Sequence, residues 1–245
     1  AIPNNCITLA LFMRMIAAHR GQIQVLHSAE EVSEKPWGFM TTLDALDEVA
    51  GPKAFARGAV HEILCEKGEG PPMFFATMLA RAASGDRAIV WSDPERRLYP
   101  PAIAAAGIPL SRLLLLRPKN EVDELWALTE CLRCCGVGVA LACPKHLSTI
   151  EARRLQLAAE RGGGIGLLLR PRSAATTPYA AATRWLVSSM SGERTVQKWK
   201  VQLIHGHGGQ VGKTVILEAC RATNSVRALE TVVDRSVSAK KAIGA

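Results

Sequence analysis

The sequence predicts an α/β fold in which a mostly parallel sheet carries helices on both faces. Short runs of consecutive apolar residues, such as 88–91 and 165–169, are typical of parallel strands buried on both faces. Segments of helical character separate these runs, as expected when each crossover between parallel strands is a helix. Apolar residues make up 48% of the 245 residues, which supports a substantial core and excludes wholesale disorder.

The predicted elements follow one another in a regular order. We expect one or two helices within residues 7–35, a break at Pro36, and a short helix near 41–47. Parallel strands are predicted at 59–64, 88–91, 113–116, 138–143 and 165–169. Helices are predicted between them at 73–84, 98–106, 122–135 and 148–161, the last with a capping box of Ser148 and Glu151. From Arg184 onward strand follows strand, which predicts an antiparallel β-hairpin extension at one edge of the sheet.

This pattern divides the chain into three parts. They are an N-terminal helical extension (1–36), a core (37–218) and a basic C-terminal tail (219–245), for which a mobile, partner-binding segment is one interpretation. Within the extension, residues 9–26 are a hypothetical contact with a partner or a second copy. The formal net charge of +8 permits contact with nucleic acid or an acidic partner, although a solvated basic face is the simpler interpretation.

Cysteine usage and hydropathy indicate a reduced, cytoplasmic protein with no membrane segment. The seven cysteines form an odd set without secretory context. The apolar run at 6–13 is too short to span a membrane and makes a poor signal peptide. Cys131, Cys134 and Cys135 have helical spacing, with Cys143 and His146 further on. We interpret them as core thiols and predict no metal site, because a second matched Cys-x-x-Cys pair is missing.

The strand ending at Leu64 leads into the place where an ATPase of the P-loop type binds phosphate. Such a loop ends in Lys and in Ser or Thr, but the chain has Pro71 and Pro72 there. Proline offers neither a cation nor a hydroxyl group, and it lacks the N–H that would donate to phosphate. We therefore predict no cofactor, no catalytic residue and no enzymatic activity. The degenerate phosphate loop comprises Cys65, Gly68, Gly70, Pro71 and Pro72.

A second segment, Gly212-Lys213-Thr214, has the ending of a phosphate-binding motif. The glycine that the motif requires at position 207 is His207, and the residues after Thr214 are β-prone instead of helical. We interpret this stretch as the loop and second strand of a hairpin over Lys198–Glu218. An ATPase that uses Gly212-Lys213-Thr214 remains the alternative.

Several blocks in a shared order resemble the RecA core between about Trp37 and Glu218. They are Leu43-Asp44, the run 57–63, the run 93–98 and the hairpin Lys198–Glu218. The chain resembles more closely the ImuA family, the RecA-like and SulA-like proteins of bacterial mutagenesis cassettes. That likeness is carried by the blocks 105–114, 124–128, 153–160 and 167–171. ImuA-like chains lack a working phosphate loop, which agrees with Pro71 and Pro72.

The resemblance implies a RecA-like core and a non-catalytic accessory role in damage-induced, error-prone translesion DNA synthesis. The implied partners are an ImuB-like protein, RecA and, indirectly, an error-prone replicative-type DNA polymerase. A SulA-like inhibitor of cell division is the alternative within the same superfamily. The glutamate that activates water in RecA falls on Glu95, which we interpret as vestigial because the phosphate-binding groups are missing.

Basic residues in three places are candidates for contact with DNA or a partner. The second DNA-binding loop of RecA falls on 170–179, which is basic and carries one aromatic residue, as single-stranded DNA contact requires. The first such loop is shortened to 144–146, so independent DNA binding is in doubt. A basic pair also lies beside an apolar stripe on the helix 148–161. The candidates are Lys145, Arg153, Arg154, Arg170 and Arg172, with an ordinary solvated surface as the alternative.

Overall fold

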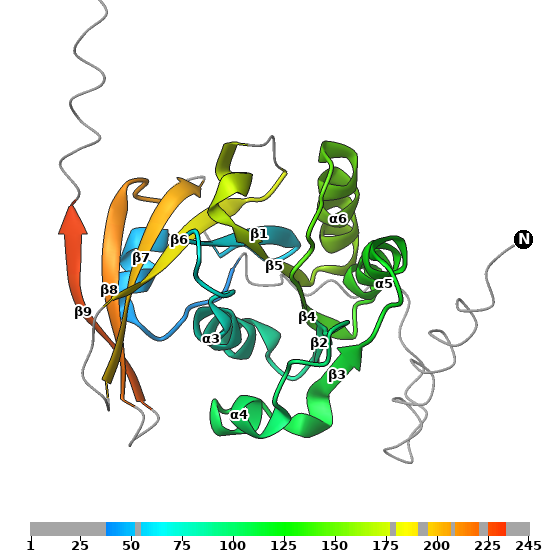
Figure 1. Cartoon of the computed structure of the whole chain (residues 1–245), viewed down its shortest axis with the longest axis horizontal. Coiled ribbons are helices and arrows are strands. Elements are labelled where there is room, and N and C mark those ends of the chain that lie inside the picture. Colours follow the sequence, from blue (N-terminus) through cyan, green and yellow to red (C-terminus); the bar gives the residue numbers. More distant parts are fainter. Residues whose placement is uncertain are drawn as a thin grey trace, which may run out of the picture. The chain divides into compact units, whose positions relative to one another are not determined.

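A computed structural model describes residues 38–51, 55–176, 180–190, 196–206, 209–220 and 225–233. Its centre is a nine-stranded sheet of order β3-β2-β4-β5-β1-β6-β7-β8-β9 (Figure 1). The strands from β3 to β6 in this order are all parallel, and β7, β8 and β9 extend the sheet in antiparallel fashion. The predicted α/β class, with a mostly parallel sheet and an antiparallel extension, is therefore confirmed.

The elements have the following bounds. The strands are β1 (Ala59–Cys65), β2 (Ala88–Ser92), β3 (Leu113–Leu116), β4 (Val137–Ala142), β5 (Ile165–Pro171), β6 (Thr183–Met190), β7 (Val196–Gly206), β8 (Lys213–Cys220) and β9 (Ser225–Val233). The helices are α2 (Asp44–Ala50), α3 (Met73–Ser84), α4 (Pro100–Ala105), α5 (Glu121–Arg133) and α6 (Thr149–Gly162). Short 3₁₀ helices lie at Leu110–Arg112 (η1) and Arg172–Thr176 (η2).

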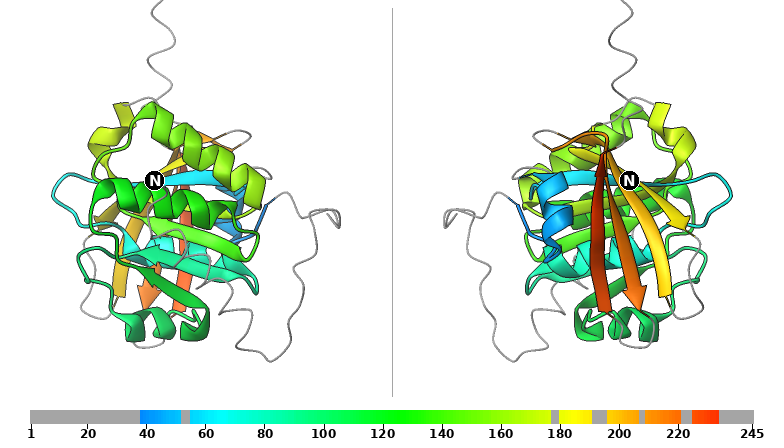
Figure 2. Two further views of the ribbon diagram at one scale, coloured as in Figure 1. Left: turned by 90° about the vertical axis from the view of Figure 1, so that its right-hand side faces the viewer. Right: turned by 90° about the vertical axis from the view of Figure 1, so that its left-hand side faces the viewer.

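Helices cover both faces of the parallel strands, which explains their uninterrupted apolar sequences. On one face, α3 packs against β2, β4 and β5, and α2 packs against β7, β8 and β9. On the other face, α5 and α6 lie side by side over β1, β2, β4 and β5 (Figure 2). Every residue of β1 and β4 is consequently buried. The main core lies between the sheet and the α2–α3 layer and includes Trp91 and Trp185.

The predicted hairpin over Lys198–Glu218 is confirmed, because β7 and β8 are antiparallel and these two residues are paired. Residues 225–233, which we expected within the tail, form the edge strand β9. Sequence analysis missed this strand because it treated the tail as one segment of little apolar mass, whereas the run 225–233 has apolar residues at 226, 228, 229, 232 and 233. Backbone pairing with β8 holds the strand, and Ala228 packs against the core cluster.

The predicted N-terminal extension 1–36, the hypothetical contact at 9–26 and the tail after 233 lie outside the described residues, so the three-part division stays a prediction. None of the helices in the described part of the chain is both long and apolar enough to cross a membrane. Of the thiols interpreted as core residues, Cys131 lies in the core, and burial raises its pKa to about 12. The interpretation was wrong for Cys135 and Cys143, which are exposed, because α5 ends at Arg133 and β4 ends at Ala142.

Local sequence signals determine both ends of α6. The predicted capping box is present: Ser148 Oγ accepts a hydrogen bond from the Glu151 N–H, and the Glu151 carboxylate accepts one from the Ser148 N–H at 2.7 Å. At the other end, a Cβ on Gly162 would lie 2.0 Å from the Leu132 carbonyl oxygen of α5. Only glycine allows α5 and α6 to approach this closely.

Candidate functional site

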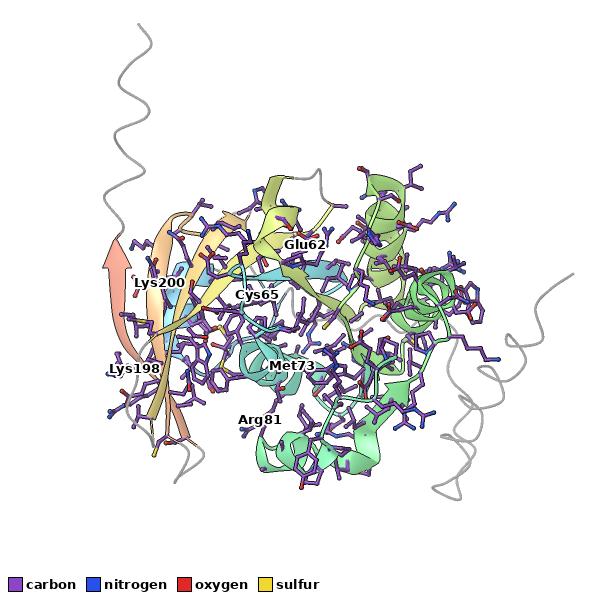
Figure 3. All side chains as sticks on the ribbon, in the orientation of Figure 1. Glu62, Cys65, Met73, Arg81, Lys198 and Lys200 are labelled. Carbon is purple, nitrogen blue, oxygen red and sulfur yellow. The ribbon has the colours of Figure 1, made fainter. Side chains whose placement is uncertain are left out.

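The loop between β1 and α3 occupies the place of the predicted phosphate loop. Cys65 ends β1 and Met73 begins α3, so the strand–loop–helix unit is present (Figure 3). Pro72 stands at the N-cap position of α3 and supplies no side-chain hydrogen bond to the helix. The Cys65 thiol donates to the Arg170 carbonyl oxygen at 3.5 Å, and burial raises its pKa. The end of the strand therefore presents a neutral thiol to the loop.

Two carboxylates of this loop bind neighbouring elements of the same chain. Glu66 forms an ion pair with Arg172 of η2. Glu69 accepts hydrogen bonds from the backbone N–H of Ser189 at 3.0 Å and from its hydroxyl group at 3.2 Å. A nucleotide would need cations and free N–H groups here. The loop carries one exposed cation, Lys67, but its two carboxylates tie it to η2 and β6, and their negative charge opposes the binding of a polyanion.

A cavity of about 260 Å³ opens beside the first turn of α3. The ring of Phe74 in this turn stacks on Trp199 of β7, with 4.2 Å between the ring centroids. The cavity is lined by Phe74, Gln197, Trp199, Ala219, Cys220, Ser225 and Val226. None of these lining residues is cationic, so the cavity offers no counter-charge to a phosphate group.

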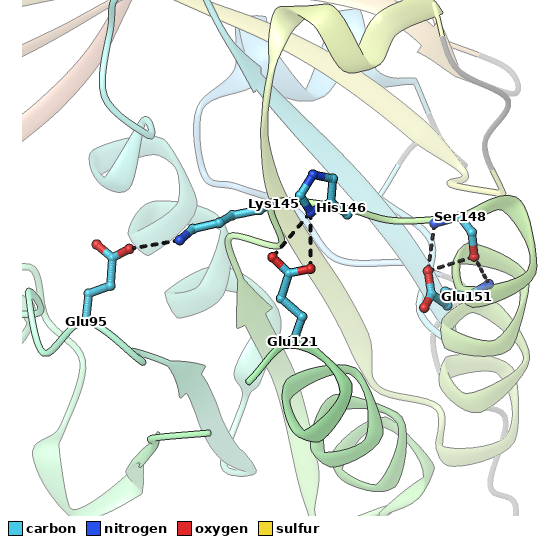
Figure 4. Close-up of polar contacts among 6 residues, drawn as sticks. All are labelled: Glu95, Glu121, Lys145, His146, Ser148 and Glu151. Carbon is cyan, nitrogen blue, oxygen red and sulfur yellow. Dashed lines mark hydrogen bonds and ion pairs between the residues drawn. The ribbon is translucent and has the colours of Figure 1, made fainter. Parts of the chain in front are cut away.

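Glu95 and Lys145 meet at the carboxyl end of the parallel strands (Figure 4). The Glu95 carboxylate is half-exposed and pairs with Arg97 at 2.8 Å and with Lys145 at 3.6 Å. Nearby, the Glu121 carboxylate of α5 lies within hydrogen-bond distance of His146 Nδ1, at 3.1 Å. Lys145 is exposed, as a contact residue must be, but an acidic partner within the chain already offsets its charge. A vestigial role for Glu95 stays a prediction.

Arg170, one of the predicted contact residues, is buried and therefore does not lie on the surface. Its side chain is only 7% exposed, and its Nη1 donates to Glu62 Oε1 at 3.2 Å. Arg184 of β6 donates through Nε to Glu62 Oε2 at 2.5 Å, and Glu62 and Arg184 are paired residues of adjacent strands. The expectation of a flexible surface arginine was wrong because Arg170 still belongs to β5, which lies next to β1 and its buried carboxylate.

The two arginines predicted on α6 are exposed, and they share their helix face with two large aliphatic side chains. Ile150 is 67% exposed and Leu157 is 47% exposed. Arg153 reaches Glu160 only at 3.8 Å, and Arg154 and Arg161 are also exposed. Sequence analysis missed Ile150, Leu157 and Arg161 as members of this face, and the apolar stripe that it placed beside the arginines is buried. The signal was their spacing, because residues 150, 154, 157 and 161 recur at intervals of three and four.

The alternative phosphate-binding segment is a β-strand. Lys213 and Thr214 begin β8, which pairs with both β7 and β9, and Thr214 is buried. A phosphate loop must lead into the N-terminus of a helix, where backbone N–H groups are free. The strand uses its N–H groups within the sheet, so the ATPase interpretation of Gly212-Lys213-Thr214 is wrong in its structural premise.

We expect the purified chain to bind no ATP at millimolar concentration, because Glu66 and Glu69 occupy the degenerate loop and Lys213 lies in a sheet. Isothermal titration and a phosphate-release assay, with and without single-stranded DNA, measure this. Lys213→Ala should behave like the wild type and like the matched control Lys200→Ala of β7. Hydrolysis that is lost only in Lys213→Ala would contradict the interpretation.

Comparison with known proteins supports the sequence-based resemblance. Protein ImuA of Caulobacter vibrioides is 28% identical over 214 residues, which cover 76% of this chain and 86% of that protein. The predicted resemblance to ImuA is confirmed. The similarity to ImuA covers more of the chain than the similarity to a second group, the cell division inhibitors.

A family model described as "Cell division inhibitor SulA" matches residues 58–166, from β1 to the start of β5. Cell division inhibitor SulA of Pectobacterium atrosepticum is 26% identical over 144 residues, which cover 57% of this chain and 84% of that protein. SulA of Cronobacter sakazakii is 28% identical over 129 residues, or 51% of this chain. The family model thus matches within the parallel half of the sheet, whereas the ImuA match covers 76% of the chain.

Proposed function

We propose that the chain is a non-catalytic accessory protein of damage-induced, error-prone translesion DNA synthesis in the cytoplasm. It acts through contacts with an ImuB-like protein, with RecA as a further contact and an error-prone replicative-type polymerase reached indirectly. The similarity to Protein ImuA over 76% of the chain carries this proposal. The β1–α3 loop supports its non-catalytic part, because Glu66 and Glu69 lie where a nucleotide would need cations.

We further propose that the core is RecA-like. The support is a parallel sheet in which β1 leads through the degenerate loop into α3, followed by an antiparallel extension that begins with β7. In this proposal the architecture is kept as a scaffold for binding while the groups for phosphoryl transfer are missing.

Contact with single-stranded DNA has weaker support than contact with proteins. Arg172 and Lys145 are exposed, but each is paired with a carboxylate of the chain. Tyr179, the aromatic residue of the predicted DNA loop, lies outside the described residues. The exposed arginines on α6 lie among aliphatic side chains, an arrangement that suits a protein surface better than a nucleic acid.

Inhibition of cell division is a second candidate function, and the SulA family model over residues 58–166 favours it. The two candidates differ in what the cell would show. An accessory protein of translesion synthesis is needed for damage-induced mutation, whereas a division inhibitor causes filamentation when it is overproduced.

The deciding experiment combines both measurements in the native bacterium. We expect deletion of the gene to lower the frequency of ultraviolet-induced mutation, and a tagged chain to co-purify with the ImuB-like protein. Overproduction should leave cell length unchanged. Filamentous cells, co-purification of the tubulin-like division protein and an unchanged mutation frequency would together establish the division inhibitor instead.

A further inference from the structure

We propose that the outer face of α6 is the surface that binds an acidic, amphipathic helix of the protein partner. This face, called the α6 face below, comprises Ile150, Arg153, Arg154, Leu157 and Arg161. The inference rests on the proposed function, because it takes the ImuB-like protein as the partner, and it adds the surface and the chemistry of the contact.

The first argument is that the α6 face breaks the pattern of a solvated helix. The opposite side of α6 is buried through small and apolar residues such as Leu155 and Ala159. The solvent side should then be polar throughout. Instead, Ile150 and Leu157 are exposed at 67% and 47%. They are seven residues apart, or about two helical turns, so both point to the same side.

The second argument is charge. Arg153 and Arg154 lie one turn after Ile150, and Arg161 lies one turn after Leu157. Of the two carboxylates of α6, Glu160 reaches Arg153 at only 3.8 Å, and Glu151, which also interacts electrostatically with Arg154, is engaged in the capping box with Ser148. The α6 face therefore alternates apolar and cationic groups. Its complement is a helix with aliphatic residues at the same two-turn spacing and with Asp or Glu beside them.

The third argument is rigidity, because a preordered surface loses less entropy on binding. The capping box fixes the first turn of α6, and Gly162 fixes its last turn against α5. Between them, the buried Gln156 accepts a hydrogen bond from the Val60 N–H at 2.9 Å and so joins α6 to β1. The aliphatic and basic side chains thus project from a helix whose backbone is held at both ends and in the middle.

A protein fits this face better than single-stranded DNA does. Proteins that bind single strands stack the bases on aromatic side chains, and α6 contains no aromatic residue from Thr149 to Gly162. Exposed aliphatic residues with arginine around them are typical of protein interfaces, where a few buried anchors supply most of the affinity.

The test measures binding of the full chain to the ImuB-like protein of the same organism by biolayer interferometry at two salt concentrations. We expect Ile150→Asp/Leu157→Asp to weaken binding by about 30-fold or more, as for truncated interface anchors. Arg153→Glu/Arg154→Glu should weaken it by about tenfold or more and reduce its dependence on salt. Matched controls on other exposed loops, Val211→Asp and Arg97→Glu, should bind within about twofold of the wild type, since surface changes outside the interface have small effects. Thermal unfolding verifies that each variant folds. If Ile150→Asp/Leu157→Asp does not fold, Ile150→Ala/Leu157→Ala replaces it, with a smaller expected loss of binding.

The outcomes separate this inference from the proposed function. If the wild type binds the ImuB-like protein and the α6 variants bind equally well, the α6 face is not the binding surface, and the proposed function stands. If the wild type itself does not bind, the proposed partner is wrong and the inference falls with it. Binding to oligo(dT) is measured in parallel by fluorescence anisotropy. Loss of DNA binding in Arg153→Glu/Arg154→Glu, with partner binding unchanged, would make this a nucleic-acid surface and overturn the proposal.

Discussion

Replacing Glu62 with glutamine is expected to lower the free energy of unfolding by about 3–5 kcal/mol, the usual cost of removing one partner from a buried ion pair. Glu62 is 1% exposed and accepts hydrogen bonds from Arg170 of β5 and Arg184 of β6, the two strands that flank β1. The substitution keeps the size of the side chain but removes its charge. Two buried guanidinium groups would then lose the carboxylate that both of them bind.

Burial of the two arginines makes the loss of the carboxylate costly. The hydrogen bond from Arg184 Nη1 to the Ala175 carbonyl oxygen, at 3.0 Å, does not depend on Glu62. Arg170 already has a buried Nε without a hydrogen-bond partner. Water cannot easily replace the carboxylate, because Arg170 and Arg184 are only 7% and 2% exposed. The cost of removing the anion from these buried cations should therefore appear as lost stability.

Urea unfolding followed by circular dichroism measures this loss. The matched control is Glu66→Gln, which breaks a second Glu–Arg pair a few residues further on. Its partner Arg172 is 57% exposed, so we expect a change below about 1 kcal/mol. A change of similar size in the two variants would contradict the assigned difference in burial. Arg170→Met offers an internal comparison: it removes the unpaired Nε and leaves one cation for one anion, so it should cost less than Glu62→Gln.

The cluster of Glu62, Arg170 and Arg184 could be predicted only in part from the sequence. The strands around it could be predicted, because uninterrupted apolar runs are enough to identify buried parallel strands. The burial of Arg170 could not be predicted, since it depends on the ion pair with Glu62, which lies 108 residues earlier in the chain. Beside Pro171 and Arg172, Arg170 looks like part of a basic loop. Only the order of the strands, with β5 next to β1, brings the two charges together.

The α6 face was predictable in part. The capping box located the start of α6, and Arg153 and Arg154 were candidates for a contact on this helix, with a solvated face as the alternative. Which residues of α6 are exposed depends on how the helix rests on the sheet, and Gly162 and Gln156 determine this through contacts with α5 and β1. The exposure of Ile150 follows from that packing. In contrast, the prediction that the β1–α3 loop lacks the lysine and hydroxyl groups of a phosphate loop needed only Pro71 and Pro72, because it depends on residue type alone.

His61 and its neighbours form a buried chain of hydrogen bonds, and only one assignment of donors and acceptors fits it. The Ala56 carbonyl oxygen can only accept, so His61 Nε2 carries the proton and donates to it at 3.0 Å. His61 Nδ1 therefore accepts from the Thr183 hydroxyl at 2.8 Å. The Thr183 oxygen in turn accepts from Trp185 Nε1 at 3.0 Å. This arrangement requires a neutral imidazole, and burial lowers the pKa of His61 from 6.5 to about 4.

The protein should consequently lose stability in mild acid. Because the pKa of His61 is lower in the folded state, its contribution is fully present above pH 6.5 and is lost as the pH falls from 6.5 through about 4. The shift corresponds to about 3 kcal/mol in total, of which about 2 kcal/mol should be lost by pH 5. Urea unfolding at neutral pH and near pH 5 measures this loss. The variant His61→Gln has no titrating ring, so it should be less stable at neutral pH yet change less between the two conditions. The other histidines are shared by wild type and His61→Gln, so an equal pH dependence in these two proteins would show that His61 is not the group responsible.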